Sequence, residues 1–81
     1  MENNAFLFAR INIKNEQEVL EKVQKINGVD YAVLLFGKED LLAKLSAKNV
    51  DVIYKETLSK LREIPGLEAT KIFLCKGVED E

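Results

Sequence analysis

Gly28-Val-Asp-Tyr-Ala-Val-Leu-Leu-Phe-Gly-Lys-Glu-Asp40 is the stretch that decides the fold, because it holds the most apolar run of the chain and is interrupted by a glycine. Val29 and Tyr31–Phe36 are β-branched, aromatic or aliphatic residues, a composition typical of a strand. The polar residues after Gly37 suit a tight connection, and Leu41–Ala47 then resumes an apolar pattern. The stretch therefore predicts a β-hairpin.

Both faces of this hairpin are apolar, because successive side chains of a strand point to opposite sides. One side of the first strand carries Tyr31, Val33 and Leu35, and the other carries Ala32, Leu34 and Phe36. Helices from the same chain can cover one face of a sheet. What covers the other face is the question on which the function depends.

Two helices and two further strands surround the hairpin. Ala5–Ile13 alternates apolar residues at odd positions with Phe6 and Phe8 on the other side, which predicts a strand whose odd side is the core face. The spacing of apolar residues then predicts a helix over Glu16–Lys25, capped by Asn15. A second helix follows Asn49 and ends near Arg62, because Pro65 disfavours helix at the residue before it, and Leu67–Cys75 reads as the last strand.

The order strand, helix, strand, strand, helix, strand predicts an α+β fold of the ferredoxin-like βαββαβ type, with four antiparallel strands and both helices on one face. The two halves echo each other, since Ile26-Asn-Gly-Val-Asp30 recurs as Ile64-Pro-Gly-Leu-Glu68 at the exit of each helix. We expect one domain over residues 1–81, with an ordered core at about 5–76 and a polar, frayed end at 76–81.

Composition argues against several classes of function. The chain has 81 residues and a net charge of −2, with no apolar run of about 20 residues, so we expect no membrane span and no direct nucleic-acid binding. The acidic, polar Met1–Asn4 is unlike a signal peptide, which favours a cytoplasmic protein. The chain has no histidine and one cysteine, Cys75, so neither an enzyme nor a metal site or cofactor is expected.

An apolar sheet face without helices predicts association between copies. Phe6 and Phe8 lie on that face together with one apolar side of the hairpin, which we assign to Leu34 and Phe36. A few surface aromatics are ordinary, but a cluster on one face marks an association surface. We therefore expect a homodimer, since pairing about a two-fold axis is the commonest arrangement.

Three other modules with this topology fit the residues less well. An RNA-recognition module needs aromatics on both central strands, and Leu41–Ala47 has none. A metal-transfer domain needs paired cysteines. A phosphatase of this topology would need a phosphate-cradling loop after the first strand, where Ile13–Glu16 has no glycine.

One resemblance is stronger. The hairpin segment Leu35–Leu42 with its Gly-x-x-Asp turn, followed by Ile64–Thr70 at the entry to the last strand, resembles the effector-binding (RAM) domain of the Lrp/AsnC transcriptional regulators over Ala5–Lys76. The resemblance implies a sheet-to-sheet dimer, further assembly into rings, and an amino acid bound between subunits near the hairpin. Only four residues precede the first strand, so the chain is similar to stand-alone members. We expect any effect on transcription to need a DNA-binding partner, most simply a full-length relative that carries the helix-turn-helix.

The same resemblance implies a ligand site. Asp40 would accept hydrogen bonds from a ligand ammonium, the backbone at Gly37 would meet the carboxylate, and Thr70 would offer a hydroxyl. The alternatives are a solvated carboxylate, a turn glycine and an ordinary strand residue. The family often has an aromatic where this chain has Glu39 and a second threonine where it has Ile72, and Glu39 could favour a cationic ligand or be solvated. The expected function is amino-acid sensing and oligomerisation in transcription regulation, and the alternative is a purely structural interaction module without a ligand.

Overall fold

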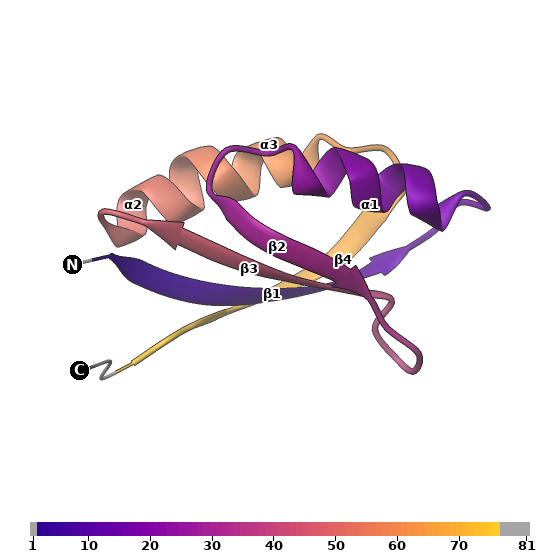
Figure 1. Ribbon diagram of the computed structural model, residues 1–81, viewed down its shortest axis with the longest axis horizontal. Coiled ribbons are helices and arrows are strands. Elements are labelled where there is room, and N and C mark those ends of the chain that lie inside the picture. Colours follow the sequence, from indigo (N-terminus) through magenta and orange to yellow (C-terminus); the bar gives the residue numbers. More distant parts are fainter. Residues whose placement is uncertain (1, 77–81) are drawn as a thin grey trace.

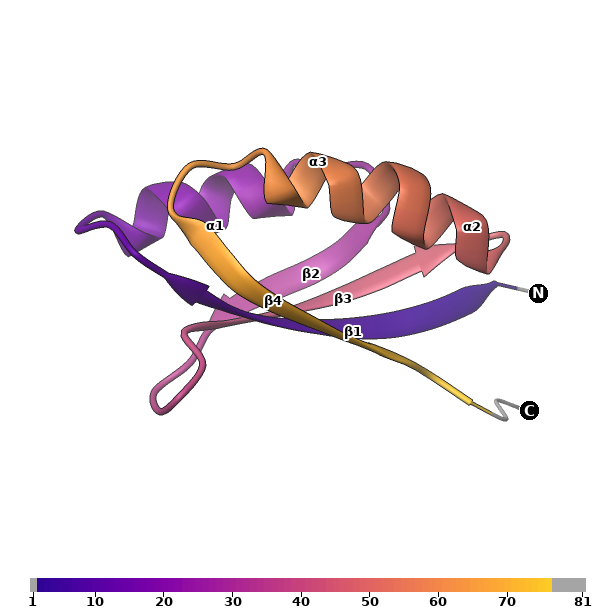
Figure 2. The same ribbon diagram turned by 180° about the vertical axis from the view of Figure 1, so that it is seen from behind.

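Four antiparallel strands carry two helices on one face in the computed structural model, which describes residues 2–76 (Figures 1 and 2). The strands are β1 (Asn3–Ile11), β2 (Val29–Leu34), β3 (Leu41–Ala47) and β4 (Leu67–Leu74), in the spatial order β2-β3-β1-β4. The helices are α1 (Glu16–Gln24) and a second helix composed of α2 (Val50–Val52), η1 (Ile53–Thr57) and α3 (Leu58–Arg62). The predicted α+β fold is confirmed. The residues after 76, where we expected a frayed end, lie outside the described part of the chain.

Both helices begin at the predicted asparagine caps. The Asn15 side chain accepts a hydrogen bond from the Glu18 N–H at 3.1 Å, and Asn49 accepts one from the Val52 N–H at 3.0 Å. These bonds satisfy donors that have no partner within the first turn of a helix. Each cap therefore fixes where the chain leaves a strand or loop and starts a helix.

The echo between the halves is a repeated helix exit. The Val29 N–H donates to the Ile26 carbonyl at 3.1 Å, and the Leu67 N–H donates to the Ile64 carbonyl at 3.3 Å. The glycines between these pairs have φ of +102° at Gly28 and +89° at Gly66, which side chains disfavour. Both copies thus turn the chain sharply from the helical layer into a strand.

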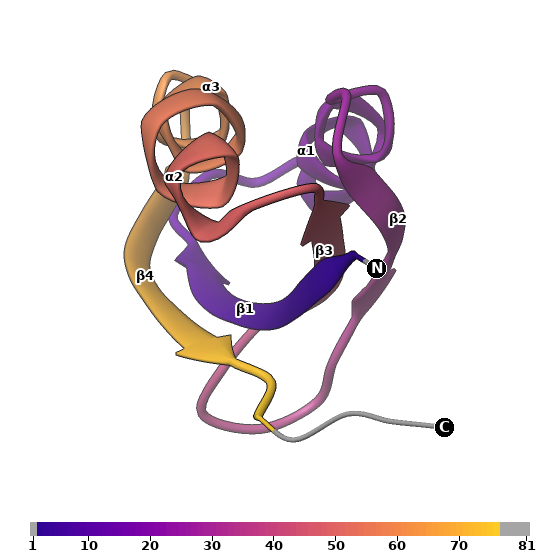
Figure 3. The ribbon, with the colours of Figure 1, turned by 90° about the vertical axis from the view of Figure 1, so that its left-hand side faces the viewer.

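The core lies between the sheet and the helices. On β1, Ala5, Leu7 and Ala9 are fully buried, and their register partners Leu45, Ala43 and Leu41 on β3 are also fully buried. The helices contribute Val19, Val23, Ile53, Leu58 and Leu61. Seen along the sheet, both helices lie on one side of the strands and the opposite side carries no helix (Figure 3). The odd positions of the first strand are therefore the core face, as predicted.

The second helix widens where the sequence predicts a regular helix. Ile53–Thr57 is a π-helical turn, in which the Leu58 N–H donates to the Ile53 carbonyl. The turn places Thr57, which is 2% exposed, so close to Gly28 that a Cβ there would lie 2.5 Å from the threonine Oγ1. The apolar spacing of this helix does not reveal such a turn, because a single π-helical turn adds one residue to the helix and most apolar positions still face the core.

Two strands end earlier in the structure than the sequence predicts. The first strand spans Asn3–Ile11 instead of reaching Ile13, because the Asn12 N–H donates to the Gly66 carbonyl at 2.7 Å and turns the chain toward α1. The strand predicted to reach Phe36 stops at Leu34. The predictions were too long because apolar residues continue past the last residues that pair with a neighbouring strand.

Candidate ligand hollow and association face

The helix-free face of the sheet has an aromatic centre. Phe6 and Phe8 of β1 are half-buried there, and Phe8 meets Phe73 of β4 edge to face, with ring centroids 5.8 Å apart and planes at 82°. On the β3 side of β1, Phe8 is in register with Leu42, and Leu42 is in register with Val33 of β2. An apolar stripe therefore crosses all four strands without cover from this chain.

A β-bulge in β4 determines which side chains join this face. Phe8 pairs with Lys71 and Arg10 pairs with Glu68, so β4 carries one more residue than β1 between these pairs. The bulge includes Ala69, whose φ is +53°. An extra residue reverses the alternation of the strand beyond it. As a result Lys71 and Phe73 lie on the helix-free face.

The predicted interface residues occupy three different places. Phe6 and Phe8 lie on the helix-free face as expected, whereas Leu34 pairs with the buried Leu41 and therefore lies on the helix side. Val33 occupies the place on the helix-free face where Leu34 was predicted. Phe36 is at the hairpin loop and has the full exposure of an isolated side chain, at 108%. The loop projects from the sheet on the side away from the helices (Figures 1 and 3).

One edge of the helix-free face carries a polar cluster. A second bulge, between Val29 and Tyr31, turns Asp30 toward Lys44, and the Lys44 Nζ lies 2.6 Å from the carboxylate. The Ser46 hydroxyl donates to the other carboxylate oxygen at 2.8 Å. The hydrogen bond from Lys44 is the main reason that the pKa of Asp30 lies below its usual value, with Ser46 contributing and burial acting against them.

Asp40 is part of the sheet structure at the end of the hairpin loop. Its Oδ2 accepts a hydrogen bond from the Ile11 N–H at 2.8 Å, and its own N–H donates to the Ala9 carbonyl at 2.9 Å. The carboxylate is therefore held in place by β1, 29 residues away in sequence. Among the bonds of the described residues Oδ1 has no donor, so this oxygen is left for another partner.

Hollows lie on two sides of Gly37. One, of about 260 Å³, is lined by Gly37 and Asp40 together with Glu16 and the segment Leu34–Phe36. The other, of about 510 Å³, is lined by Arg10, Gly37, Lys38, Glu39, Ala69 and Lys71, and we call it the basic hollow. The structure thus brings Gly37 and Asp40 together, as predicted from the resemblance.

Thr70 stands apart from them. It lines neither hollow beside Gly37, and the Arg62 Nε lies 3.4 Å from its hydroxyl oxygen on the helix side of the sheet. The bulge at Ala69 is the reason, because its extra residue reverses the alternation of β4 and so moves Thr70 to the helix side.

The two carboxylate oxygens of Glu39 have different environments. Its Oε2 accepts from the Lys71 Nζ at 3.0 Å, whereas its Oε1 is buried without a hydrogen-bond donor. Leaving a buried acceptor unpaired costs about 1–3 kcal/mol. Sequence reasoning noticed Glu39 as a departure from the family, but it missed Arg10 and Lys71, because no pattern in the sequence predicts that they meet under the hairpin.

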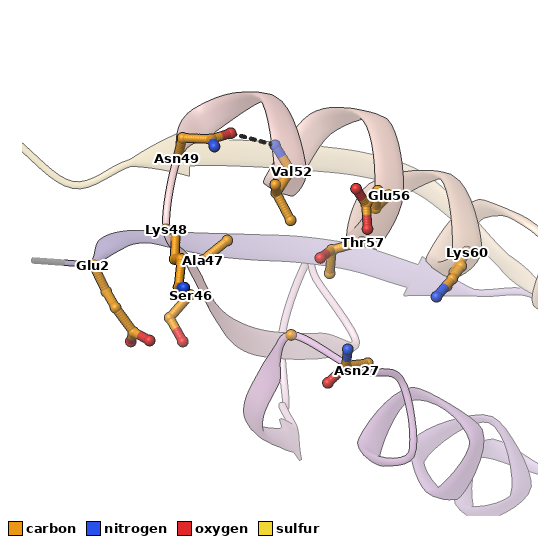
Figure 4. A pocket seen from close by; sticks show the side chains of 11 residues that line it. Glu2, Asn27, Ser46, Ala47, Lys48, Asn49, Val52, Glu56, Thr57 and Lys60 are labelled. Carbon is orange, nitrogen blue, oxygen red and sulfur yellow. Dashed lines mark hydrogen bonds between the residues drawn. The ribbon is translucent and has the colours of Figure 1, made fainter.

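A polar hollow also lies at the opposite end of the molecule. It has a volume of about 320 Å³ between the exit of α1 and the start of the second helix, and Figure 4 shows Asn27, Thr57 and Lys60 around it. Lys48 and Lys60 are balanced there by Glu2 and Glu56. The lining therefore favours no ligand charge. In residues 2–76, no three metal-ligating side chains gather, and no helix is long and apolar enough to span a membrane.

Fold and surface together define a class of protein: a small βαββαβ domain with an open, apolar sheet face and ligand-sized hollows at its central hairpin. The sequence model of the Lrp/AsnC ligand binding domain matches residues 4–76. The chain belongs to the Lrp/AsnC family, whose members are transcriptional regulators, and the predicted membership is confirmed.

Sequence and structure relatives agree with this membership. The uncharacterized HTH-type transcriptional regulator PF0250 of Pyrococcus furiosus is 38% identical over 55 residues, which are 68% of this chain and 37% of that protein. The matched segment thus spans about 37% of the length of such a regulator. The fold is also that of TTHA0845 from Thermus thermophilus, with a TM-score of 0.86 and 20% identity over 98% of this chain and 99% of the other. The regulator NMB0573 of Neisseria meningitidis, solved as a complex with L-Met, matches with a TM-score of 0.80 and 18% identity over 98% of this chain and 53% of the other.

Proposed function

We propose that this chain is a non-enzymatic effector-sensing and oligomerisation domain that dimerises through the helix-free face of its sheet. The observation that carries the proposal is the uncovered apolar stripe, in which Val33 is 42% and Phe73 is 56% exposed beside Phe6 and Phe8. Contiguous apolar surface of this kind marks association sites in proteins. A second copy would cover it about a two-fold axis, and the exposed hairpin with Phe36 would be available for further assembly into a ring.

The proposed effector is a small amino-acid-like molecule bound at the hairpin. The backbone at Gly37 and the unpaired Oδ1 of Asp40 lie beside the same hollow, so they offer a donor and an acceptor to a zwitterion. The bond from Ile11 holds the carboxylate in one orientation before a ligand arrives. The L-Met complex of the Neisseria regulator supports an amino acid as the class of ligand.

Regulation of transcription would need a partner with a DNA-binding domain. The relatives are HTH-type regulators of which this chain matches 37%, and a full-length relative could share the same sheet interface. With a net charge of −2, the chain alone should show no sequence-selective shift of DNA at physiological salt. We place this activity in the cytoplasm.

A structural module without a ligand is the second candidate. The observation that favours it is the hydrogen bond between Asp40 and Ile11, which gives the carboxylate a role in the fold. A thermal-shift panel of free amino acids, run with light scattering at micromolar concentration, separates the two. A ligand at 100 times its dissociation constant should stabilise the fold by about 2.7 kcal/mol. Dimers without any shift would favour the structural module, and a monomer would contradict both.

A further inference from the structure

The basic hollow has a charge opposite to that of the whole protein. Its lining contains three cationic side chains, Arg10, Lys38 and Lys71, and one carboxylate, Glu39, a net charge of +2 in a chain whose net charge is −2. Its volume of about 510 Å³ lies within the range of small-molecule sites. Positive charges gathered in a recess attract an anion more strongly than positive charges dispersed over a surface do.

Two of these cations have no ion-pair partner in the described residues. Lys71 is paired with Glu39 at 3.0 Å, whereas neither Arg10 nor Lys38 has a carboxylate within 4.0 Å anywhere in residues 2–76. Glu68 is the register partner of Arg10 across the strands, yet it makes no ion pair with it and does not line the hollow. The Arg10 guanidinium is therefore available to a carboxylate in a bidentate arrangement.

The hollow is built by a strained backbone. Ala69 lines it with a φ of +53°, a conformation that non-glycine residues rarely adopt, and the bulge around Ala69 turns Lys71 toward Glu39. Bulges and left-handed non-glycine residues recur beside functional sites, where they aim a side chain. Without the extra residue in β4, Lys71 would point to the helices.

Glu39 adds a hydrogen-bond acceptor to the basic hollow. An ionised carboxylate can accept about four hydrogen bonds, and Glu39 accepts one, from Lys71. Its Oε1 is without a donor. An ammonium group in the hollow would compete with the exposed Lys71 side chain for this carboxylate.

We propose that the basic hollow is a second ligand site of this domain and binds an acidic amino acid, whose two carboxylates meet Arg10 and Lys38 while its ammonium meets Glu39. The proposal goes beyond the proposed function, whose effector is bound in the hollow beside Asp40. Gly37 lines this hollow as well as the one beside Asp40, so a ligand here would contact the same turn from the other side.

Matched ligands test each contact by calorimetry and thermal shift at fixed ionic strength. L-glutamate and L-glutamine differ by one carboxylate charge, so glutamate should bind about tenfold more tightly if Arg10 and Lys38 recognise it. L-glutamate and glutarate differ by the ammonium, so glutarate should bind more weakly if Glu39 recognises that group. Inorganic phosphate at the same ionic strength reports unspecific anion binding.

Variants assign these differences to residues. Arg10→Gln should reduce the preference for glutamate over glutamine, and Arg10→Lys should restore part of it. Lys25→Gln, which removes the same charge from an exposed position outside the hollow, is the control and should leave the preference unchanged. Glu39→Gln should reduce the preference for glutamate over glutarate. The midpoint of unfolding without ligand is measured for each variant, so that a loss of folding is recognised.

The outcomes separate this inference from the proposed function. If glutamine or another neutral or basic amino acid stabilises the domain and glutamate does not, the inference is wrong and the effector-sensing function stands. If phosphate competes as well as glutamate, or if Lys25→Gln acts like Arg10→Gln, the hollow is an unspecific anion site and the inference is wrong. If no amino acid binds while dimers form, the effector part of the proposed function fails together with the inference.

Discussion

The carboxylate of Asp40 accepts a hydrogen bond from the backbone N–H of Ile11 at 2.8 Å, across 29 positions of sequence. Together with the bond from the Asp40 N–H to the Ala9 carbonyl, it joins the end of the hairpin loop to the end of β1. A residue proposed to meet a ligand therefore also supports the fold. Its two roles can be measured separately.

Asp40→Ala should lower the free energy of unfolding by about 1.5 kcal/mol, because it removes an acceptor of a charge-assisted hydrogen bond. Asp40→Asn, which keeps an acceptor, should cost less. Urea unfolding measures both, and Glu21→Ala, at an exposed position of α1, is the control with an expected change within about 0.5 kcal/mol. Equal stability of Asp40→Ala and the parent protein would show that the bond contributes nothing.

The same Asp40→Ala protein should lose ligand-induced stabilisation. Loss of one charge-assisted hydrogen bond corresponds to roughly ten- to a hundredfold weaker binding, which calorimetry detects. The dimer should persist in light scattering, since Asp40 lies at the loop and outside the apolar stripe. A variant that binds the effector as tightly as the parent would leave Asp40 with a structural role alone.

Phe8→Glu should dissociate the proposed dimer. Phe8 lies on the helix-free face against Phe73, and a carboxylate there would be desolvated in the apolar interface, a cost that its register partner Lys71, already paired with Glu39, does not remove. Light scattering at micromolar concentration should then report a monomer. Tyr54→Glu is the control, because Tyr54 is 40% exposed in the helical layer, and it should leave the dimer unchanged. A dimeric Phe8→Glu protein would exclude this face as the interface.

Gly28→Ala should destabilise the fold more than Gly37→Ala. Both positions have positive φ, and that backbone strain costs about 1–3 kcal/mol for alanine. A Cβ at Gly28 would also lie 2.5 Å from the Thr57 Oγ1, whereas one at Gly37 would meet no atom within 4 Å. Chemical denaturation measures the difference.

A double-mutant cycle assigns the steric part to the π-turn. Thr57→Ala should remove the clash, so the double variant should be less destabilised than the sum of the single ones. Additive effects would mean that Gly28 is needed for its backbone conformation alone.

Acid should weaken the fold partly through Asp30. Its pKa is lowered in the folded state by Lys44 and then by Ser46, so its contribution is present at neutral pH. That contribution is lost as the pH falls through the usual range of aspartate toward the lowered folded value. Asp30→Asn and Lys44→Gln should each flatten this part of the stability profile, measured by urea unfolding from neutral to acidic pH. Unchanged profiles in both variants would contradict the role of the pair.

Much of the architecture can be predicted from local signals. The caps at Asn15 and Asn49, the glycine exits at Gly28 and Gly66 and the strand Leu41–Ala47 all lie where the sequence indicates. Each depends on the conformational preference or hydrogen-bonding capacity of a few neighbouring residues. Gly37 and Asp40 line one hollow because they lie only three positions apart in the same loop.

The sequence by itself determined the element order, the helix caps and the face that β1 buries, because period and capping are properties of short segments. Only the tertiary structure decided that Thr70 faces the helices, that Leu34 does so as well, and that Arg10 and Lys71 line one hollow. These placements depend on bulges at Asp30 and Ala69 and on a loop that folds across β1. One inserted residue reverses every side chain beyond it, and no local pattern announces the insertion, since it is settled by pairing with strands that are distant in sequence.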